Sequence, residues 1–186
     1  MIYAYYFFAT ILIWLSYRSY RGGIVYERFI REGFSQTVET DLPFATIFAP
    51  CRGVDRRFEE NLRRLFSQKY RKFEIVFIVD DKKDTAVDEI EAAIREYSSD
   101  TVSARLLVAP KAVESSQKIA NLLHAIPQAD TRSEVFAFVD SDACTGPEWL
   151  ASLVAAASKP NVGAATGYRW LISENGKLGS ELASAW

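Results

Sequence analysis

The sequence contains few of the residues on which several common kinds of site depend. It has one histidine, His124, and two cysteines, Cys51 and Cys144, among 186 residues. A structural zinc site needs several histidine or cysteine ligands, and a Ser-His-Asp triad needs a positioned histidine, so the composition argues against both. The two cysteines are far apart and have no metal-ligand spacing. We therefore interpret them as free thiols in a reducing compartment.

An excess of charge of one sign is also missing. The chain has 22 basic and 24 acidic residues, a formal net charge of -2, which gives no reason to expect a nucleic acid as a partner. No glycine-rich turn follows the first apolar run at residues 44–49, which stops at Pro50, Cys51, Arg52 and Gly53. A dinucleotide-binding dehydrogenase needs such a turn, so that class is disfavoured.

Charged side chains are absent from the first 17 residues, and Ile2 to Leu15 is almost wholly apolar or aromatic. About 17 residues is the lower limit for a helix that spans a bilayer. We expect residues 1–17 to form a single-pass transmembrane anchor and residues 18–42, which contain four arginines up to Arg31, to form a basic juxtamembrane linker. Basic flanks stay in the cytoplasm, so we expect the rest of the chain there. A buried or peripheral amphipathic helix remains an alternative.

After this segment, apolar runs alternate with segments of helical periodicity. The runs predict five strands, at residues 44–49, 73–79, 104–109, 135–139 and 162–166. The periodic segments between them predict helices around residues 58–66, 87–97, 119–126 and 149–154, the last opened by a Thr145 cap. This alternation predicts an α/β fold with a mostly parallel, Rossmann-type sheet flanked by helices.

Acidic residues follow two of the predicted strands directly. Asp140 and Asp142 stand one residue apart after the run 135–139, and a second acidic group, at residues 80–84, follows the run 73–79. Parallel strands end at the same edge of a sheet, so both groups are expected at one edge, where ligands of such sheets bind. Two carboxylates at this spacing can hold a divalent cation, and the cation can hold a diphosphate. Solvated turns are the alternative for both groups.

Several ordered motifs resemble the family 2-type glycosyltransferases, and most closely the ceramide glucosyltransferase-like branch. The motifs are residues 50–55, 60–62, 79–84, 118–122, 139–142 and 166–170. The resemblance covers residues 43–186, nearly all of the chain after the expected anchor. It implies a GT-A-like nucleotide-sugar-binding domain whose C-terminal part is missing.

The resemblance also implies roles for particular residues. Those expected to contact the nucleotide-sugar are Pro50, Arg52, Gly53, Asp81, Asp84, Lys118 and Asp140. Of the acids, Asp84 matches the branch best as the nucleoside contact, and Lys118 would lie near the diphosphate. Asp140 and Asp142 would bind Mn²⁺ or Mg²⁺. Tyr168, Arg169 and Trp170 would line the sugar or acceptor side.

The implied reaction is transfer of a sugar, with inversion, from a UDP-sugar to a lipid acceptor. We expect glucose from UDP-glucose as the donor and ceramide or a similar lipid as the acceptor. The general base of such an enzyme and its (Q/R)xxRW element are expected beyond Trp186, so the chain reads as an N-terminal portion. A non-catalytic nucleotide-sugar-binding protein on the same scaffold is the alternative, and a response-regulator-like domain is disfavoured because its acids need a different strand order.

Overall fold

Largely apolar runs form the four strands at the centre of the fold. In the computed structural model, which describes residues 2–34, 41–167 and 179, the strands are β1 (Ala45–Pro50), β2 (Phe73–Val79), β3 (Val102–Val108) and β4 (Val135–Phe138). All pair in parallel in the order β3-β2-β1-β4. The predicted parallel α/β sheet is confirmed. The two central strands, β1 and β2, are largely apolar because they are buried on both faces.

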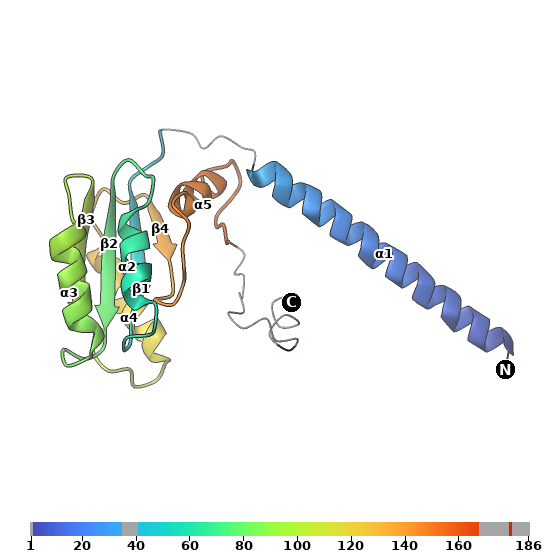
Figure 1. Cartoon of the computed structure of the whole chain (residues 1–186), viewed down its shortest axis with the longest axis horizontal. Helices are drawn as coiled ribbons and strands as arrows, with labels where there is room; N and C mark the ends of the chain where they lie inside the picture. Colours follow the sequence, from blue (N-terminus) through green and yellow to red (C-terminus); the bar gives the residue numbers. More distant parts are fainter. Residues whose placement is uncertain (1, 35–40, 168–178, 180–186) are drawn as a thin grey trace. The chain divides into compact units, whose positions relative to one another are not determined.

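Helices cover both faces of this sheet (Figure 1). They are α2 (Phe58–Phe66), α3 (Ala86–Tyr97), α4 (Gln117–Ala125) with the short 3₁₀ turn η1 (Ile126–Gln128), and α5 (Trp149–Ala157). Alternate side chains of a strand point to opposite faces. Ile47, Ile75 and Phe77 therefore pack with α2, α3 and α5, whereas Phe48 and Val76 pack with α4. Each large side chain buried in this way stabilises the fold by roughly 1.5–3 kcal/mol.

The fifth predicted strand and the predicted start of the last helix are wrong. Residues 162–167 form no strand, and α5 begins at Trp149 without a side-chain cap from Thr145. The segment 162–166 consists mainly of glycine and alanine, whose small side chains offer little surface to pack on a sheet. Thr145 is buried, and its hydroxyl accepts a hydrogen bond from Gln68 instead of capping the helix.

The N-terminal residues form a separate unit, Met1–Val38, which contains one long helix. This helix, α1 (Ile2–Phe34), continues for 33 residues, from the expected anchor into the expected basic linker. No proline interrupts it, and an ion pair between Glu27 and Arg31, one turn apart at 2.7 Å, favours its later turns. Among the described residues, no helix combines the length and the apolar character needed to cross a membrane.

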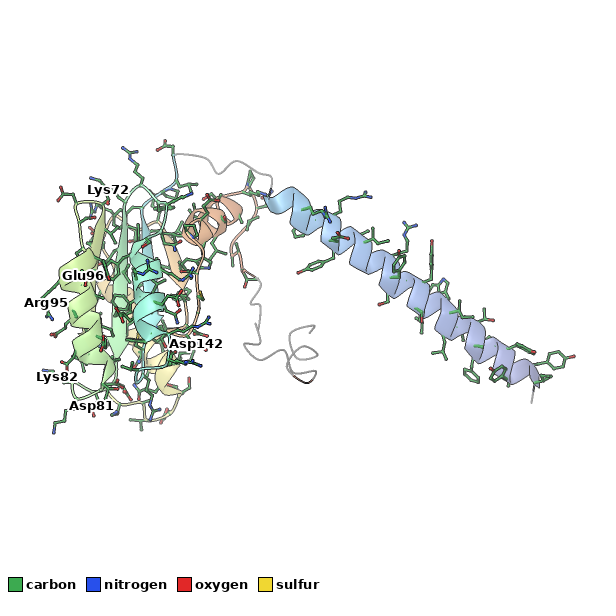
Figure 2. The ribbon with its side chains drawn as sticks, viewed as in Figure 1. Lys72, Asp81, Lys82, Arg95, Glu96 and Asp142 are labelled. Atoms are coloured by element: carbon green, nitrogen blue, oxygen red, sulfur yellow. The ribbon has the colours of Figure 1, made fainter. Side chains whose placement is uncertain are left out.

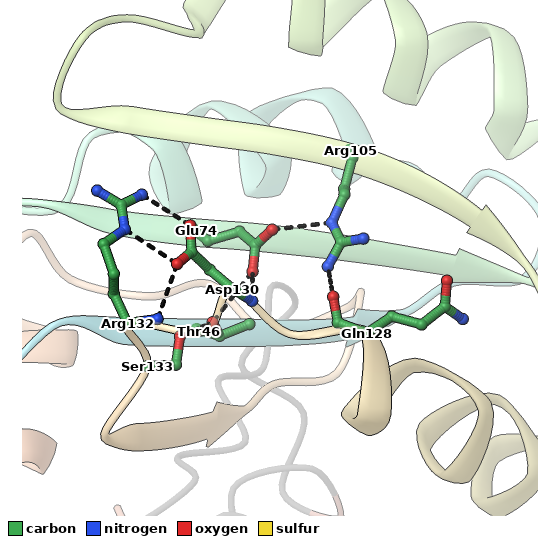
Figure 3. Close-up of polar contacts among 7 residues, drawn as sticks. All are labelled: Thr46, Glu74, Arg105, Gln128, Asp130, Arg132 and Ser133. Atoms are coloured by element: carbon green, nitrogen blue, oxygen red, sulfur yellow. Dashed lines mark hydrogen bonds and ion pairs between the residues drawn. The ribbon is translucent and has the colours of Figure 1, made fainter.

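A buried carboxylate organises the edge of the sheet at which the strands begin (Figure 3). Glu74 of β2 accepts hydrogen bonds from the Thr46 hydroxyl at 3.1 Å, the Arg105 guanidinium at 2.8 Å and the backbone amide of Asp130 at 3.0 Å. Arg105 also donates to the carbonyl of Gln128. This group of contacts, the Glu74 network, joins β1, β2, β3 and the segment before β4. It therefore fixes the strands relative to one another.

Candidate functional site

The loops that follow the strands bring both acidic groups to one edge of the sheet. The parallel ladder extends just beyond the strands, through the amide of Cys51 to the carbonyl of Ile78 at 2.8 Å and the amide of Val139 to the carbonyl of Phe48 at 3.1 Å. The acids at 80–84 and at 140–142 therefore follow β2 and β4 at the same edge, with β1 between them. In Figure 2, Asp81 and Asp142 lie toward one end of the sheet and Lys72 at the other.

Asp84 joins the loop after β1 to the loop after β2. Its Oδ1 accepts hydrogen bonds from the backbone amides of Gly53 and Ala86, both at 2.8 Å. Gly53 has a φ of 66°, in the left-handed region that glycine adopts most readily, and this conformation belongs to the turn whose amide reaches Asp84. The structure thus brings together Gly53 and Asp84, both of which are expected to contact the nucleoside. The carboxylate of Asp84 also holds the two loops together.

The other residues predicted around the nucleoside lie in the same two loops. Pro50 is the last residue of β1, and Arg52, which is exposed, follows it. Asp81 is exposed and accepts a hydrogen bond from the amide of Lys83 at 2.9 Å, which makes a local turn after β2. Within the described part of the chain, no hydrogen bond or ion pair joins the Asp81 side chain to the loop after β1. Of the two candidate acids, Asp84 is therefore the better connected.

Asp80 lies in the same loop but was not among the predicted site residues. Oδ2 of Asp80 pairs with Nζ of Lys111 at 2.8 Å, and the Asp80 side chain is only 9% exposed. The hydrogen bond from Lys111 holds the pKa of this carboxyl below its usual value, against the opposing effect of burial. The contact joins the end of β2 to the loop after β3. The position of Asp80 as the first residue after an apolar strand was a usable signal for it.

Lys118 of α4 reaches the first acid of the pair at 140 and 142. Its Nζ donates to Oδ1 of Asp140, and the two side chains are 55% and 40% exposed. The start of α4 is capped by the Ser116 hydroxyl, which accepts from the amide of Ile119 at 3.4 Å. Capping fixes the first turn of α4, on which Lys118 lies. A cation is thus held beside a carboxylate expected to bind a metal.

The donor atoms of Asp140 and Asp142 suit a hard divalent cation. Both side chains are accessible, and carboxylate oxygen is the ligand that Mg²⁺ and Mn²⁺ prefer. Within residues 2–34, 41–167 and 179, no group of three or more histidine, cysteine, aspartate or glutamate side chains could hold a metal by itself. Protein sites for Mg²⁺ with only one or two carboxylates take their remaining ligands from substrate phosphates and water. The pair fits a cation that arrives with a diphosphate.

The two cysteines differ in their surroundings. Both are free thiols, as expected, with Cys51 buried and Cys144 exposed. Burial, reinforced by Asp84 and Asp55, raises the pKa of the Cys51 thiol to about 12. This thiol is therefore protonated at neutral pH and contributes packing instead of nucleophilic chemistry. Tyr168, Arg169 and Trp170, predicted for the sugar or acceptor side, lie outside the described residues.

Comparison with known proteins identifies the family. The model of glycosyl transferase family 21 matches residues 7–185, nearly the whole chain. The protein therefore belongs to this glycosyltransferase family. The match confirms the resemblance that the motifs suggested, including the branch to which they pointed.

The curated relatives are ceramide glucosyltransferases. Ceramide glucosyltransferase 3 of Caenorhabditis elegans is 29% identical over 91 residues, which are 49% of this chain and 19% of that protein. The ceramide glucosyltransferase of Komagataella phaffii is 40% identical over 62 residues, 33% of this chain and 12% of that protein. The matched region is thus a small part of each relative. Among solved structures, a mannosyltransferase from Pyrobaculum calidifontis in complex with GDP-Man and Mn²⁺ aligns with 80% of this chain and 43% of its own, at 18% identity and a TM-score of 0.49.

Proposed function

We propose that this chain is the donor-binding part of a glycosyltransferase that uses a UDP-sugar, with glucose as the sugar and ceramide or a similar lipid as the acceptor. The observation that carries the proposal is the contact between Lys118 and Asp140. It places a cationic side chain beside the first of two carboxylates at the edge of the sheet where the loops meet. The family and the names of the relatives, which are ceramide glucosyltransferases, support the choice of glucose and ceramide.

Each residue of this edge has a distinct task in the proposed binding. Asp140 and Asp142 would hold Mn²⁺ or Mg²⁺, which when bound stabilises the charge that develops on the leaving diphosphate. Lys118 would turn from Asp140 to the diphosphate oxygens, because an ammonium group pairs with either anion. The carboxylate of Asp84 would accept a hydrogen bond from the nucleoside while its Oδ1 keeps the two loops together. An inverting reaction also needs a general base at the acceptor hydroxyl.

A non-catalytic nucleotide-sugar-binding protein is the second candidate. It is favoured by the same contacts, since the described residues account for donor binding and not for deprotonation of an acceptor. Both candidates predict that UDP-glucose binds, but only a glycosyltransferase releases UDP. Adding ceramide in mixed micelles to the gene product and measuring the release of UDP would separate them. Binding without release from the complete gene product would favour the binding protein.

Metal-dependent donor binding is the central test. Titration calorimetry of the whole chain with UDP-glucose should show tight binding with Mn²⁺ and much weaker binding after EDTA. Asp140→Ala and Asp142→Ala should each weaken the Mn²⁺-dependent binding at least tenfold, because each removes a ligand that compensates the diphosphate charge. Asp88→Ala, which removes an exposed acid of α3, is the matched control and should bind like the parent. Equal affinity with Mn²⁺ and with EDTA would contradict the proposed metal site.

We also propose that α1 attaches the protein to a membrane, with the α/β unit on the cytoplasmic side. The apolar first half of α1 exposes large side chains, including Phe7, Leu12 and Ile13 at 63%, 64% and 71% exposure, and four arginines follow by Arg31. Exposed apolar surface on a helix favours its burial in a lipid bilayer, and basic segments that flank a membrane helix stay on the cytoplasmic side. Protease added to sealed cells should leave the α/β unit intact.

Vesicle binding tests the attachment without depending on orientation. The chain should sediment with phosphatidylcholine vesicles, and Leu12→Asp combined with Ile13→Asp should abolish this sedimentation. Ser19→Asp, in the part of α1 that follows the apolar run, adds one negative charge without removing an apolar side chain and should have little effect. Recovery of the parent chain in the supernatant would contradict the proposed membrane attachment.

A further inference from the structure

Two buried amide side chains, one on α2 and one just after its end, bind the segment between β4 and α5. Asn61, near the start of the helix, donates from Nδ2 to the carbonyl of Ser141 at 3.1 Å. Gln68, just after the end of the helix, donates from Nε2 to the carbonyl of Gly146 at 2.9 Å. The two residues are 3% and 7% exposed. One amide therefore holds the start of this segment, where the two acids lie, and the other holds its end, where α5 begins.

The two amides differ in how completely they are paired. Oε1 of Gln68 accepts a hydrogen bond from the amide of Leu150 at 3.0 Å, so both ends of that side chain have partners. Oδ1 of Asn61 is buried and has no hydrogen-bond partner in the described structure. Turning the amide over would not help, because the carbonyl of Ser141 needs a donor and only Nδ2 supplies one. A buried acceptor without a partner destabilises a fold.

An apolar side chain of similar shape would fill the position of Asn61 without this cost. The carbonyl of Ser141 could then bond to water, since Ser141 is only partly buried. Folding alone therefore gives no reason for an amide at residue 61. The one hydrogen bond that the side-chain amide makes is to Ser141, which lies between Asp140 and Asp142. The position of these two carboxylates is therefore the property that an amide at residue 61 can affect.

We propose that Asn61 is a positioning residue for the metal site. By holding the carbonyl of Ser141, it fixes the plane of the peptide that links Ser141 to Asp142, and with it the separation of the two carboxylates. Outer groups that hold metal ligands in place typically change metal affinity by about 10–100-fold when they are removed. This inference rests on the proposed function, because it assumes that Asp140 and Asp142 bind a divalent cation with the diphosphate.

The test compares Asn61→Leu with Gln68→Met in the whole chain. Each variant replaces a buried amide, on α2 or just after its end, with an apolar side chain of similar size. Asn61→Leu should leave the thermal midpoint unchanged or raise it, because it removes an unpaired oxygen, yet it should weaken Mn²⁺-dependent binding of UDP about tenfold or more. Gln68→Met should lower the midpoint, because it breaks four hydrogen bonds, and should leave the Mn²⁺-dependent affinity of the folded protein unchanged.

A second variant and a second readout guard against a simple loss of folding. Asn61→Asp keeps the shape but turns a carboxylate oxygen toward the carbonyl of Ser141, so it should also weaken Mn²⁺ binding. UDP binding in EDTA, which does not need the metal, should be unchanged in both Asn61 variants. The electron paramagnetic resonance spectrum of bound Mn²⁺ should differ between parent and Asn61→Leu, and not between parent and Gln68→Met.

The outcomes separate this inference from the function on which it rests. If the parent chain binds UDP equally with Mn²⁺ and with EDTA, the proposed metal site fails and the role of Asn61 fails with it. If the parent requires Mn²⁺ but Asn61→Leu binds like the parent, only the role of Asn61 is overturned. If Asn61→Leu and Gln68→Met lose Mn²⁺-dependent affinity equally, α2 merely supports the segment as a whole, which also overturns the proposal.

Discussion

The two ends of the parallel sheet use charged side chains in different ways. At the end where the strands begin, hydrogen bonds from three separate parts of the chain converge on Glu74, whose side chain is only 8% exposed. At the end where the strands finish, the contacts are separate, and each joins two segments of the chain. Asp84 pairs with Gly53, and Asp140, which is 40% exposed, pairs with Lys118.

The difference indicates which end is built for stability and which for binding. Both oxygens of Glu74 accept hydrogen bonds from within the protein, so this carboxylate is occupied and shielded from solvent. At the other end, Lys118 and Asp140 are both accessible, and each is the kind of group that can exchange its partner for a phosphate or a metal ion. Charge by itself therefore does not mark a site, whereas charge that remains accessible at the meeting point of several loops does.

Removing the central carboxylate at the first end should give the largest effect on stability. Glu74→Ala leaves the Arg105 guanidinium, the Thr46 hydroxyl and the amide of Asp130 without their acceptor, and we expect a loss of about 3 kcal/mol in the free energy of unfolding. Urea denaturation measures it. The affinity of the folded protein for UDP-glucose should stay the same, because the network lies at the opposite end of the sheet from the acids.

A matched control tests whether burial of Glu74 accounts for the large expected loss of stability. Glu91 pairs with Arg95 at 3.7 Å on α3, where both side chains are more than half exposed. Glu91→Ala should therefore cost less than about 0.5 kcal/mol. Equal losses from Glu74→Ala and Glu91→Ala would show that the Glu74 network contributes no more than a surface ion pair, and the contrast between the two ends would fail.

The strands could be predicted because the sheet is covered by helices on both faces. Burial on both faces makes β1 and β2 apolar without alternation, and such runs are visible in the sequence. Glu74 interrupts one of them, which signals that a buried acid needs partners but not which ones, since Arg105 lies 31 residues away. The run at 162–166 misled the prediction because small residues are apolar yet pack poorly as a strand.

The part of the site that lies directly after the strands could be predicted from the sequence. Acids that directly follow apolar strands could be placed at one edge, and the family resemblance assigned Lys118 to the same place. Contacts between distant helices and loops could not be predicted in this way. Asn61 and Ser141 are 80 residues apart, and nothing in the local pattern of α2 distinguishes a buried asparagine from an exposed one. Asp80 was missed because its neighbours Asp81 and Asp84 matched the family motif better.

Two substitutions of Asp84 should separate its structural contact from its proposed contact with the nucleoside. Asp84→Asn keeps an oxygen that can accept from the amides of Gly53 and Ala86 but removes the negative charge. It should leave the thermal midpoint nearly unchanged and weaken the binding of UDP about tenfold, even in EDTA. Asp84→Ala removes both contacts, so it should lower the midpoint as well as the affinity.

Asp81→Asn is the control for charge in the same loop. It removes one negative charge from an exposed side chain, so it should change the affinity for UDP little if Asp84 is the nucleoside contact. A tenfold loss in Asp81→Asn together with normal binding in Asp84→Asn would exchange the two assignments. Normal binding in both variants would mean that the loop after β2 does not contact the nucleoside.

The smallest expected effect concerns pH at the end where the strands begin. Two hydrogen bonds from the Arg132 guanidinium, at 2.9 and 2.7 Å, lower the pKa of Asp130 from 3.8 to about 2. Because the folded pKa is depressed, the stabilisation is fully present above pH 3.8 and is lost as the pH falls toward 2. Arg132 is 61% exposed, so the contribution is below about 1 kcal/mol. Asp130→Asn should be slightly less stable than the parent in urea at pH 6, and the two should converge between pH 4 and pH 2.5. A difference that stays constant over this range would show that the charge of Asp130 does not contribute to stability through Arg132.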